Sequence, residues 1–215
     1  DVDFLELKNH RLDRTFVGFL QRSMTPAHYR RCSSKVAIRR FYRNLAALLS
    51  LPAVYLGLCR DTWYDVDRYL EIEDKAPSTF YFIPFKGDPG REARGFPAPR
   101  HRAAKYHLHD YAHTVQGLLQ SGCEVGVHGL DAWHDVERGR RELSVLQKET
   151  GQDRQGIRMH WLHYSQQSPK LLREAGFFYD SSFGYNDAVG YRAGTAQVFR
   201  NPGGSAIPEL PLVIM

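Results

Sequence analysis

Apolar side chains recur every three or four residues in the first part of the chain. This spacing predicts an amphipathic helix from residue 34 that ends near Pro52. Its apolar positions are Val36, Ile38, Phe41, Tyr42, Leu45, Leu48 and Leu49. The same spacing over residues 61–73 predicts a second helix, which stops before Pro77. Residues 11–29 mix aromatic and arginine side chains without clean periodicity, and this stretch is irregular or helical.

The pattern changes to short β-prone runs from residue 78 onward. Strands are predicted at 78–84 ("STFYFIP"), 123–127, 156–159 and 177–179, with helices at 110–120, 136–150 and 168–174. Residues 85–102 are rich in Gly, Pro and Arg and predict a long surface loop. Strands that alternate with helices favour parallel βαβ units, so the expected class is α/β. An α/β barrel and an open doubly wound sheet both fit this pattern.

Composition describes one globular domain. The 215 residues are 42% hydrophobic and 25% charged, and no apolar run approaches the length of about 18 residues that spans a bilayer. Three cysteines without CxxC spacing predict buried thiols in a reducing compartment. With no visible signal peptide, we expect a cytoplasmic protein.

The net charge is +5, but the arginines are spread along the chain and accompany no nucleic-acid-binding motif. We therefore expect no nucleic-acid partner. A solvated basic face or attraction to an anionic small substrate explains the charge. Serine-hydrolase, dinucleotide, P-loop and HExxH signatures are absent from the sequence.

Polar residues gather where the predicted parallel strands end, which is the edge at which such sheets place their chemistry. His128 and Asp131 follow one strand, Arg158 and His160 lie at the end of the next, and Asp180 follows another. His128 is either a metal ligand or a histidine that caps its strand with a hydrogen bond. Arg158 either holds a carboxylate of the site or forms a structural ion pair with Asp180.

Asp1 and Asp3 flank Val2 at the start of the chain. In an extended strand these carboxylates point to the same side, so both can face one pocket. One would then bind a metal while the other acts as a base. The alternative is a pair of solvated acidic residues.

Taken in order, "DVD", "STFYFIP", "EVGVHG", "GIRMHW" and "ELPLVIM" make the chain resemble the polysaccharide deacetylase (NodB homology) superfamily, in a branch with an aspartate–any–aspartate first motif. The resemblance implies one domain over residues 1–215, a distorted (β/α) barrel incomplete at both termini, with a helical insertion at about 11–75. It also implies a divalent metal, usually zinc, and hydrolysis of an N-acyl group on a sugar.

By the same resemblance, Asp1 is the base, Asp3 and His128 are metal ligands, Arg158 orients the base and Trp161 is the aromatic residue of the third motif. The chain departs from the family pattern at Ala132, where a second metal histidine is expected, and it lacks the late histidine that serves as general acid.

The hypothesis is therefore a metal-dependent hydrolase that removes an acetyl or formyl group from an amino sugar or a related amide. Because position 132 is alanine, the third metal ligand is Asp131, His134 or a more distant group, and Asp131 is the candidate we adopt. His160 protonates the departing amine. Tyr191 and Arg192 join Trp161 in binding the carbohydrate, with Arg192 gripping an anionic part of the substrate. The alternatives are a catalytically silent carbohydrate-binding protein of the same fold and a hydrolase of a cyclic amide or ureide.

Overall fold

The computed structural model describes residues 1–10, 13–25, 34–72, 77–92, 95–200 and 207–213. The chain divides into two compact units, one formed by residues 1–3 and 70–215 and the other by residues 4–69. The second unit overlaps the expected helical insertion at about 11–75. That this stretch interrupts a single domain stays a prediction.

The first unit contains a parallel sheet of four strands in the order β1-β2-β3-β4. The strands are β1 (Thr79–Phe82), β2 (Glu124–Gly129), β3 (Gly156–Met159) and β4 (Tyr179–Asp180). Single parallel bridges extend both edges, because Val2 pairs with Phe82 and Glu209 pairs with Asp180. The α/β class and the parallel sheet are therefore confirmed. Among the described residues no strand pairing closes the sheet, so a barrel is not shown.

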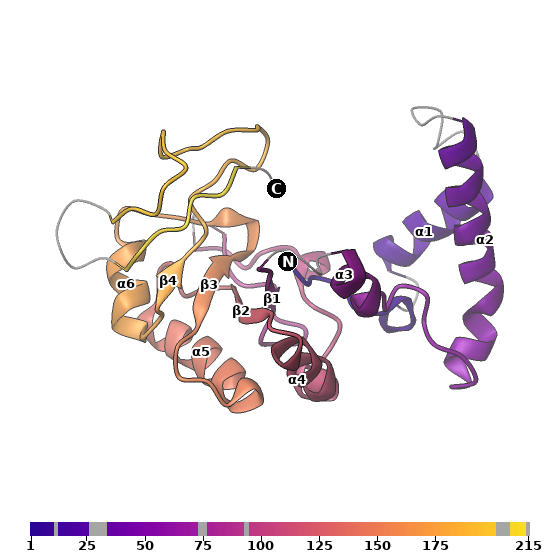
Figure 1. The fold of residues 1–215 in the computed structure, drawn as a ribbon, viewed down its shortest axis with the longest axis horizontal. Coiled ribbons are helices and arrows are strands. Elements are labelled where there is room, and N and C mark those ends of the chain that lie inside the picture. The colour runs from indigo at the N-terminus through magenta and orange to yellow at the C-terminus, as the bar shows by residue number, and fades with distance from the viewer. Residues whose placement is uncertain (11–12, 26–33, 73–76, 93–94, 201–206, 214–215) are drawn as a thin grey trace. The chain divides into compact units, whose positions relative to one another are not determined.

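Three helices connect these strands and follow one flank of the sheet (Figure 1). They are α4 (Ala112–Gln120), α5 (Val136–Thr150) and α6 (Ser168–Ala175), and α4 and α5 both pack on β2. Asp135 caps α5, since its carboxylate accepts hydrogen bonds from the amides of Glu137 and Arg138. Short 3-10 turns lie at η3 (Arg100–Arg102), η4 (Leu108–Tyr111) and η5 (His160–Leu162).

The two faces of the sheet carry different side chains. Val125, Val127, Ile157 and Met159 alternate onto one face and are at most 1% exposed, which is the burial that drives this layer together. The register pairs Tyr81 with Gly126 and His128 with Arg158 on the other face. That face therefore carries the polar groups.

Two glycines make room on the polar face. A Cβ atom at Gly126 would lie 2.7 Å from the Tyr81 ring, and one at Gly156 would lie 2.0 Å from the Tyr179 ring. Because neither strand carries a side chain there, the two rings reach across the sheet and their hydroxyls meet at 3.0 Å. The middle of this face is thus filled by tyrosines from the outer strands, and the site lies at the carboxyl ends beyond them.

The unit of residues 4–69 is helical. It contains η1 (Leu7–Asn9), α1 (Arg14–Met24) and α2 (Ser34–Tyr55), around a small core of Leu7, Phe19, Ala47 and Leu51. The helix predicted to end near Pro52 continues to Tyr55, so the proline lies inside its last turn, where few residues follow that a kink could misplace. The helix expected over 61–73 is shorter, since α3 spans Val66–Ile72.

Cysteine placement differs from expectation. Cys59 is exposed and Cys123 is half-buried, so the prediction of buried thiols is wrong for Cys59, and Cys32 lies outside the described residues. Within the described part of the chain, every helix is too short or too polar to cross a bilayer.

Candidate metal centre

His128 is delivered to the site by strand β2, which continues through Gly129, so this histidine lies inside the strand rather than after it. Its side chain is fully buried. The Nδ1–H group donates to the backbone carbonyl of Arg158 on the neighbouring strand at 2.9 Å. This bond leaves the Nε2 lone pair directed into the site, an arrangement typical of metal-binding histidines.

His160 follows β3 directly, and its Nδ1 lies 2.9 Å from His128 Nε2. Its other ring nitrogen, Nε2, accepts a hydrogen bond of 2.9 Å from the indole N–H of Trp161. Burial, with a smaller contribution from the neighbouring His128, lowers the pKa of His160 to about 4. The ring is therefore neutral at pH 7, as a metal ligand must be.

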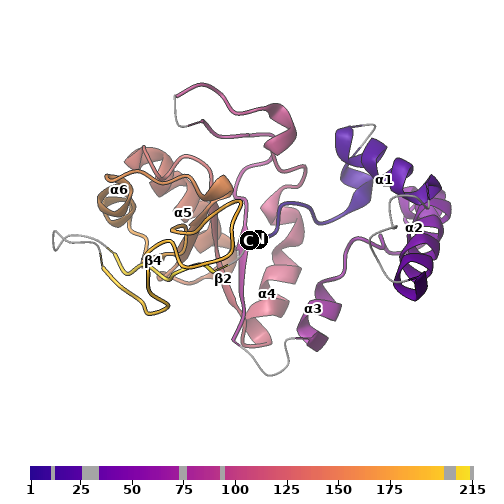
Figure 2. The same cartoon turned by 90° about the horizontal axis from the view of Figure 1, so that it is seen from above.

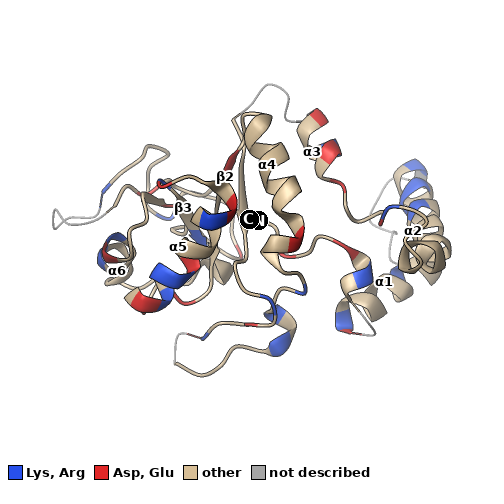
Figure 3. Cartoon of the chain, turned by 90° about the horizontal axis from the view of Figure 1, so that it is seen from below, with Lys and Arg blue, Asp and Glu red and all other residues tan. Residues whose placement is uncertain are grey.

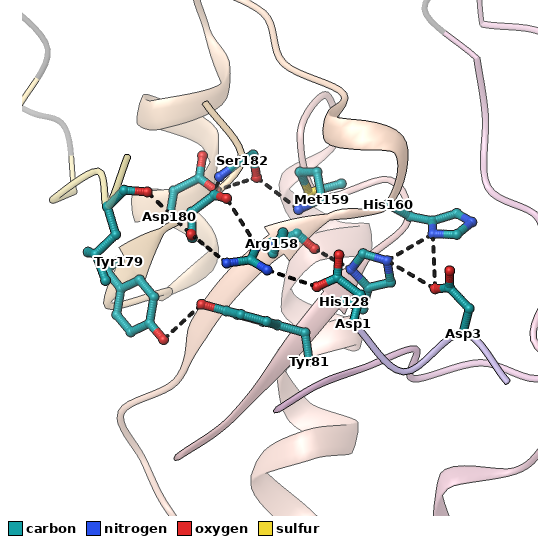
Figure 4. A network of polar contacts seen from close by, with 12 residues as sticks. Asp1, Asp3, Tyr81, His128, Arg158, Met159, His160, Tyr179, Asp180 and Ser182 are labelled. Atoms are coloured by element: carbon teal, nitrogen blue, oxygen red, sulfur yellow. Dashed lines mark hydrogen bonds and ion pairs between the residues drawn. The ribbon is translucent and has the colours of Figure 1, made fainter. Parts of the chain in front are cut away.

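Asp3 completes the group from the start of the chain (Figure 4). Its Oδ1 lies 3.2 Å from His128 Nε2 and 3.5 Å from His160 Nδ1. Burial alone would raise the pKa of Asp3, but interactions with the two imidazoles more than offset burial and lower it. Oδ1 is buried and no hydrogen bond from the described residues satisfies it. A buried carboxylate oxygen in this position needs a cation or a proton.

The three atoms fit a tetrahedral metal. Zinc–ligand bonds of about 2.0–2.1 Å separate neighbouring tetrahedral ligands by about 3.3 Å. The observed separations are 2.9, 3.2 and 3.5 Å. Among the described residues Asp3, His128 and His160 are the group with metal-ligating geometry, and two imidazoles with one carboxylate suit zinc.

The Asp1 side chain lies beside this group, next to His128 (Figure 4). Its Oδ1 accepts from Arg158 Nη1 at 3.1 Å. Arg158 is held from three directions: its Nε and Nη2 donate to the carbonyl and hydroxyl of Ser181, and its guanidinium covers the Tyr81 ring at 4.5 Å. The arginine is thus fixed in place, and it fixes the Asp1 carboxylate.

Asp180, the alternative partner of Arg158, is engaged elsewhere. Its Oδ1 accepts from the amide and hydroxyl of Ser182. Burial raises the pKa of both Asp180 and Glu209, and the two carboxyls also hydrogen-bond each other. Ser182 in turn accepts the amide of Met159 at 2.8 Å, so this buried acidic pair supports the end of β3.

Asp131, expected as the third ligand, belongs to a different cluster. Its Oδ1 accepts the Arg91 amide at 2.7 Å and lies 3.4 Å from His134, while its Oδ2 lies 3.0 Å from Arg138. The backbone amides of Leu130 and Asp131 are held by the buried carboxylate of Glu142. Asp131 is therefore not part of the group that could hold a metal ion, which contains His160 together with Asp3 and His128.

The three predicted carbohydrate-binding residues differ in position. Trp161 touches His160 and is 43% exposed, so it borders the centre. Its backbone φ of +60° and that of Leu162, +49°, are strained for non-glycine residues, which is typical of functional sites. Tyr191 is exposed, and the Arg192 guanidinium lies over the Phe183 ring at 4.6 Å. No described contact joins Tyr191 or Arg192 to the centre.

Sequence reasoning placed His160 at this edge of the sheet, and the role of an acid that it gave this residue stays a prediction. The structure adds that His160, directly after β3, lies close enough to His128 and Asp3 to share a metal ion with them. Sequence reasoning missed Ser181 and Tyr81, which hold Arg158, and Arg102, whose guanidinium covers the Trp161 ring at 4.1 Å.

Comparisons with known proteins add a structural likeness but no related sequence. No family model matches the sequence, and a search of curated proteins finds no relative. A solved structure described as a putative polysaccharide deacetylase from Mycobacterium smegmatis aligns with 90% of this chain at 20% identity and a TM-score of 0.46. The chain covers 54% of that protein's length.

Proposed function

We propose that this chain is a metal-dependent hydrolase that removes an N-acyl group, acetyl or formyl, from an amino sugar or a related amide. The observation that carries the proposal is the convergence of Asp3 Oδ1, His128 Nε2 and His160 Nδ1 within 3.5 Å of one another. A second carboxylate, that of Asp1, lies beside them and is held by Arg158. The resemblance of the ordered motifs to polysaccharide deacetylases supports the same reaction.

In this proposal Asp3, His128 and His160 hold one divalent ion, with zinc as the preferred metal. When bound, such an ion lowers the pKa of a water molecule and polarises an acyl carbonyl. His128 keeps its orientation through the Arg158 carbonyl. The buried surroundings of both imidazoles keep bulk water from competing for them.

Asp1 is the proton carrier. Its carboxylate takes a proton from the attacking water as the new C–O bond forms, and it returns that proton to the nitrogen as the C–N bond breaks. The products are a carboxylic acid and a free amine. Arg158 holds Asp1 in position for both transfers. His160 is not the acid here, because both of its ring nitrogens are engaged.

The test is metal analysis joined to an activity panel. Purified protein should hold about one zinc per chain, and a chelator should abolish hydrolysis of N-acetyl and N-formyl amino sugars. His160→Ala should lose metal, whereas His134→Ala, which removes an imidazole of the Asp131 cluster, should keep it. Protein with no metal and no activity would support a silent carbohydrate-binding role. Turnover of a cyclic amide or ureide alone would move the reaction to another C–N bond.

A full metal complement in His160→Ala, together with its loss in Asp131→Asn, would restore Asp131 as the third ligand. Because Asp131 also binds the Arg91 amide and Arg138, the unfolding midpoint of each variant has to be measured beside its metal content. Loss of metal without loss of stability identifies a ligand.

A further inference from the structure

Arg102 brings a positive charge to the border of the proposed metal centre. Its guanidinium covers the Trp161 ring at 4.1 Å, and the indole N–H of Trp161 donates to His160 at 2.9 Å. Two contacts therefore connect Arg102 with a residue of the metal-binding group.

The guanidinium is poorly neutralised for its burial. The Arg102 side chain is 18% exposed, and the ion pair that the structure gives it is a long one, 3.5 Å from Nη1 to Glu92 Oε1. Its Nε is buried and has no hydrogen-bond partner among the described residues. Cations this far out of water are normally paired and fully hydrogen-bonded, so the charge of Arg102 is incompletely compensated and favours an anion beside it.

The segment that carries Arg102 is itself basic. Residues 85–105 hold six Lys or Arg residues against two Asp or Glu residues, although the whole chain has a net charge of only +5. The described parts of this segment form a long excursion from the sheet unit (Figure 2), and Figure 3 shows blue Lys or Arg positions on its short helical turn. Two of the basic residues, Arg100 and Arg102, belong to η3. A positive rim of this kind attracts anions to the site that it borders.

Trp161 supplies the second half of a binding surface. Its indole is partly exposed although its backbone adopts the left-handed conformation that non-glycine residues rarely take. The surrounding fold must hold this conformation, and the result is an aromatic ring placed between a cation and the metal-binding group. Aromatic faces are suitable platforms for the apolar face of a sugar ring.

We propose that Arg102 and Trp161 form an anion subsite, and that the substrate is an acylated amino sugar carrying a negatively charged group, a carboxylate or a phosphate. This inference rests on the proposed function, which gives an acylated amino sugar as the substrate, and adds that this sugar is negatively charged. Arg102 grips the anionic group while the sugar lies against Trp161, which directs the acylated nitrogen toward the metal-binding group. The sequence analysis offered Arg192 for this role, and the Arg192 guanidinium lies over the Phe183 ring.

The test compares three probes by isothermal titration calorimetry with zinc-loaded protein. They are neutral N-acetylglucosamine, its 6-phosphate, and N-acetylmuramic acid, which carries a carboxylate. At least one anionic sugar should bind about tenfold or more tightly than the neutral sugar, with an affinity that falls as salt rises. The phosphate and carboxylate arms show which anion the subsite prefers.

Arg102→Met should lower the affinity for that anionic sugar about tenfold or more and leave the neutral sugar within about threefold. Arg102→Lys should restore part of the loss. Arg100→Met is the matched control, because Arg100 is an exposed arginine of the same 3-10 turn, and it should bind like the native protein. Glu92→Gln removes the competing carboxylate and should keep or strengthen binding of the anion.

Equal binding of all three sugars, or no measurable binding of either anionic sugar, overturns the inference. It is also overturned if Arg102→Met weakens neutral and anionic sugars alike, because that result assigns Arg102 a structural role. Failure of the proposed function has a different signature: no hydrolysis of any acyl sugar, while calorimetry still reports whether the anion is preferred.

Discussion

The contact between Arg158 and Asp1 offers a sharp test of the proposed chemistry, because the side chain and the backbone of Arg158 do different things. The guanidinium donates to Asp1 at 3.1 Å, whereas the backbone carbonyl accepts from His128. Arg158→Met removes the first contact and keeps the second. We therefore expect the variant to bind metal normally and to lose activity.

The size of the expected loss of activity follows from the burial of the Arg158–Asp1 ion pair. The side chains of Arg158 and Asp1 are 20% and 14% exposed, so water screens their contact less than it screens a surface pair. A hydrogen bond to a charged group contributes about 1.5–3 kcal/mol. If the bond positions Asp1 in the transition state, its loss should lower kcat/KM about 10- to 100-fold.

The assay measures kcat/KM on an N-acyl amino sugar beside zinc content for the native protein, Arg158→Met and Arg158→Lys. Lysine should recover only part of the activity, because it cannot reach Asp1 and both Ser181 acceptors with one ammonium group. Arg192→Met is the control, since this arginine makes no described contact with the centre. Activity within about threefold of native in Arg158→Met would refute the role given to Arg158. Loss of zinc in Arg158→Met would refute the claim that the Arg158 side chain is not needed for metal binding.

Three further outcomes are expected. Gly156→Ala should lower the free energy of unfolding by about 1–3 kcal/mol, because its Cβ would meet a tyrosine ring of β4 at 2.0 Å, whereas Gly117→Ala on helix α4 has open space and should stabilise by about 0.5–1 kcal/mol. The raised pKa values of Asp180 and Glu209 mean that these carboxyls stay protonated to a higher pH in the folded state than in the unfolded chain. The free energy of unfolding should therefore fall as pH rises above about 4.5, and Glu209→Gln should reduce this fall. Adding zinc to chelator-treated protein should change the tryptophan emission. If His160 binds the metal through Nδ1, its proton must sit on Nε2, the atom that accepts the Trp161 indole N–H, so that hydrogen bond is lost. Trp161→Phe should lose most of the emission change.

Urea unfolding at several pH values checks the first two outcomes, with Glu174→Gln as a control carboxylate on the exposed face of α6. Equal stability of Gly156→Ala and Gly117→Ala would contradict the packing of the tyrosines over the sheet. A Glu209→Gln variant with the native pH dependence would show that the acidic pair is not protonated in the fold. Unchanged emission on zinc binding would mean that His160 is bound without disturbing Trp161.

Much of the sheet unit could be predicted from local pattern. The strand at 156–159 and the helix at 136–150 match β3 and α5 to the residue, because clean periodicity and a capping aspartate mark their ends. Strand β2 extends two residues beyond the predicted run, through His128 and Gly129, since pairing with β3 continues there. The residues around the centre were predicted for a physical reason, namely that carboxyl ends of parallel strands meet at one edge.

Most strands and helices of the sheet unit, and the parallel pairing of the strands, could be inferred from the amino-acid sequence, because hydrophobic period and turn chemistry are local properties of the chain. Which side chains meet at the edge of the sheet depends on contacts between segments that lie far apart in the chain. Asp131 follows His128 by three residues, yet Arg138 and the Arg91 amide hold it in another cluster. His160, from the neighbouring strand, and Asp3, from the chain start, reach His128 instead. Distance along the chain does not set distance across a sheet, where strand pairing and competing hydrogen-bond partners decide the neighbours.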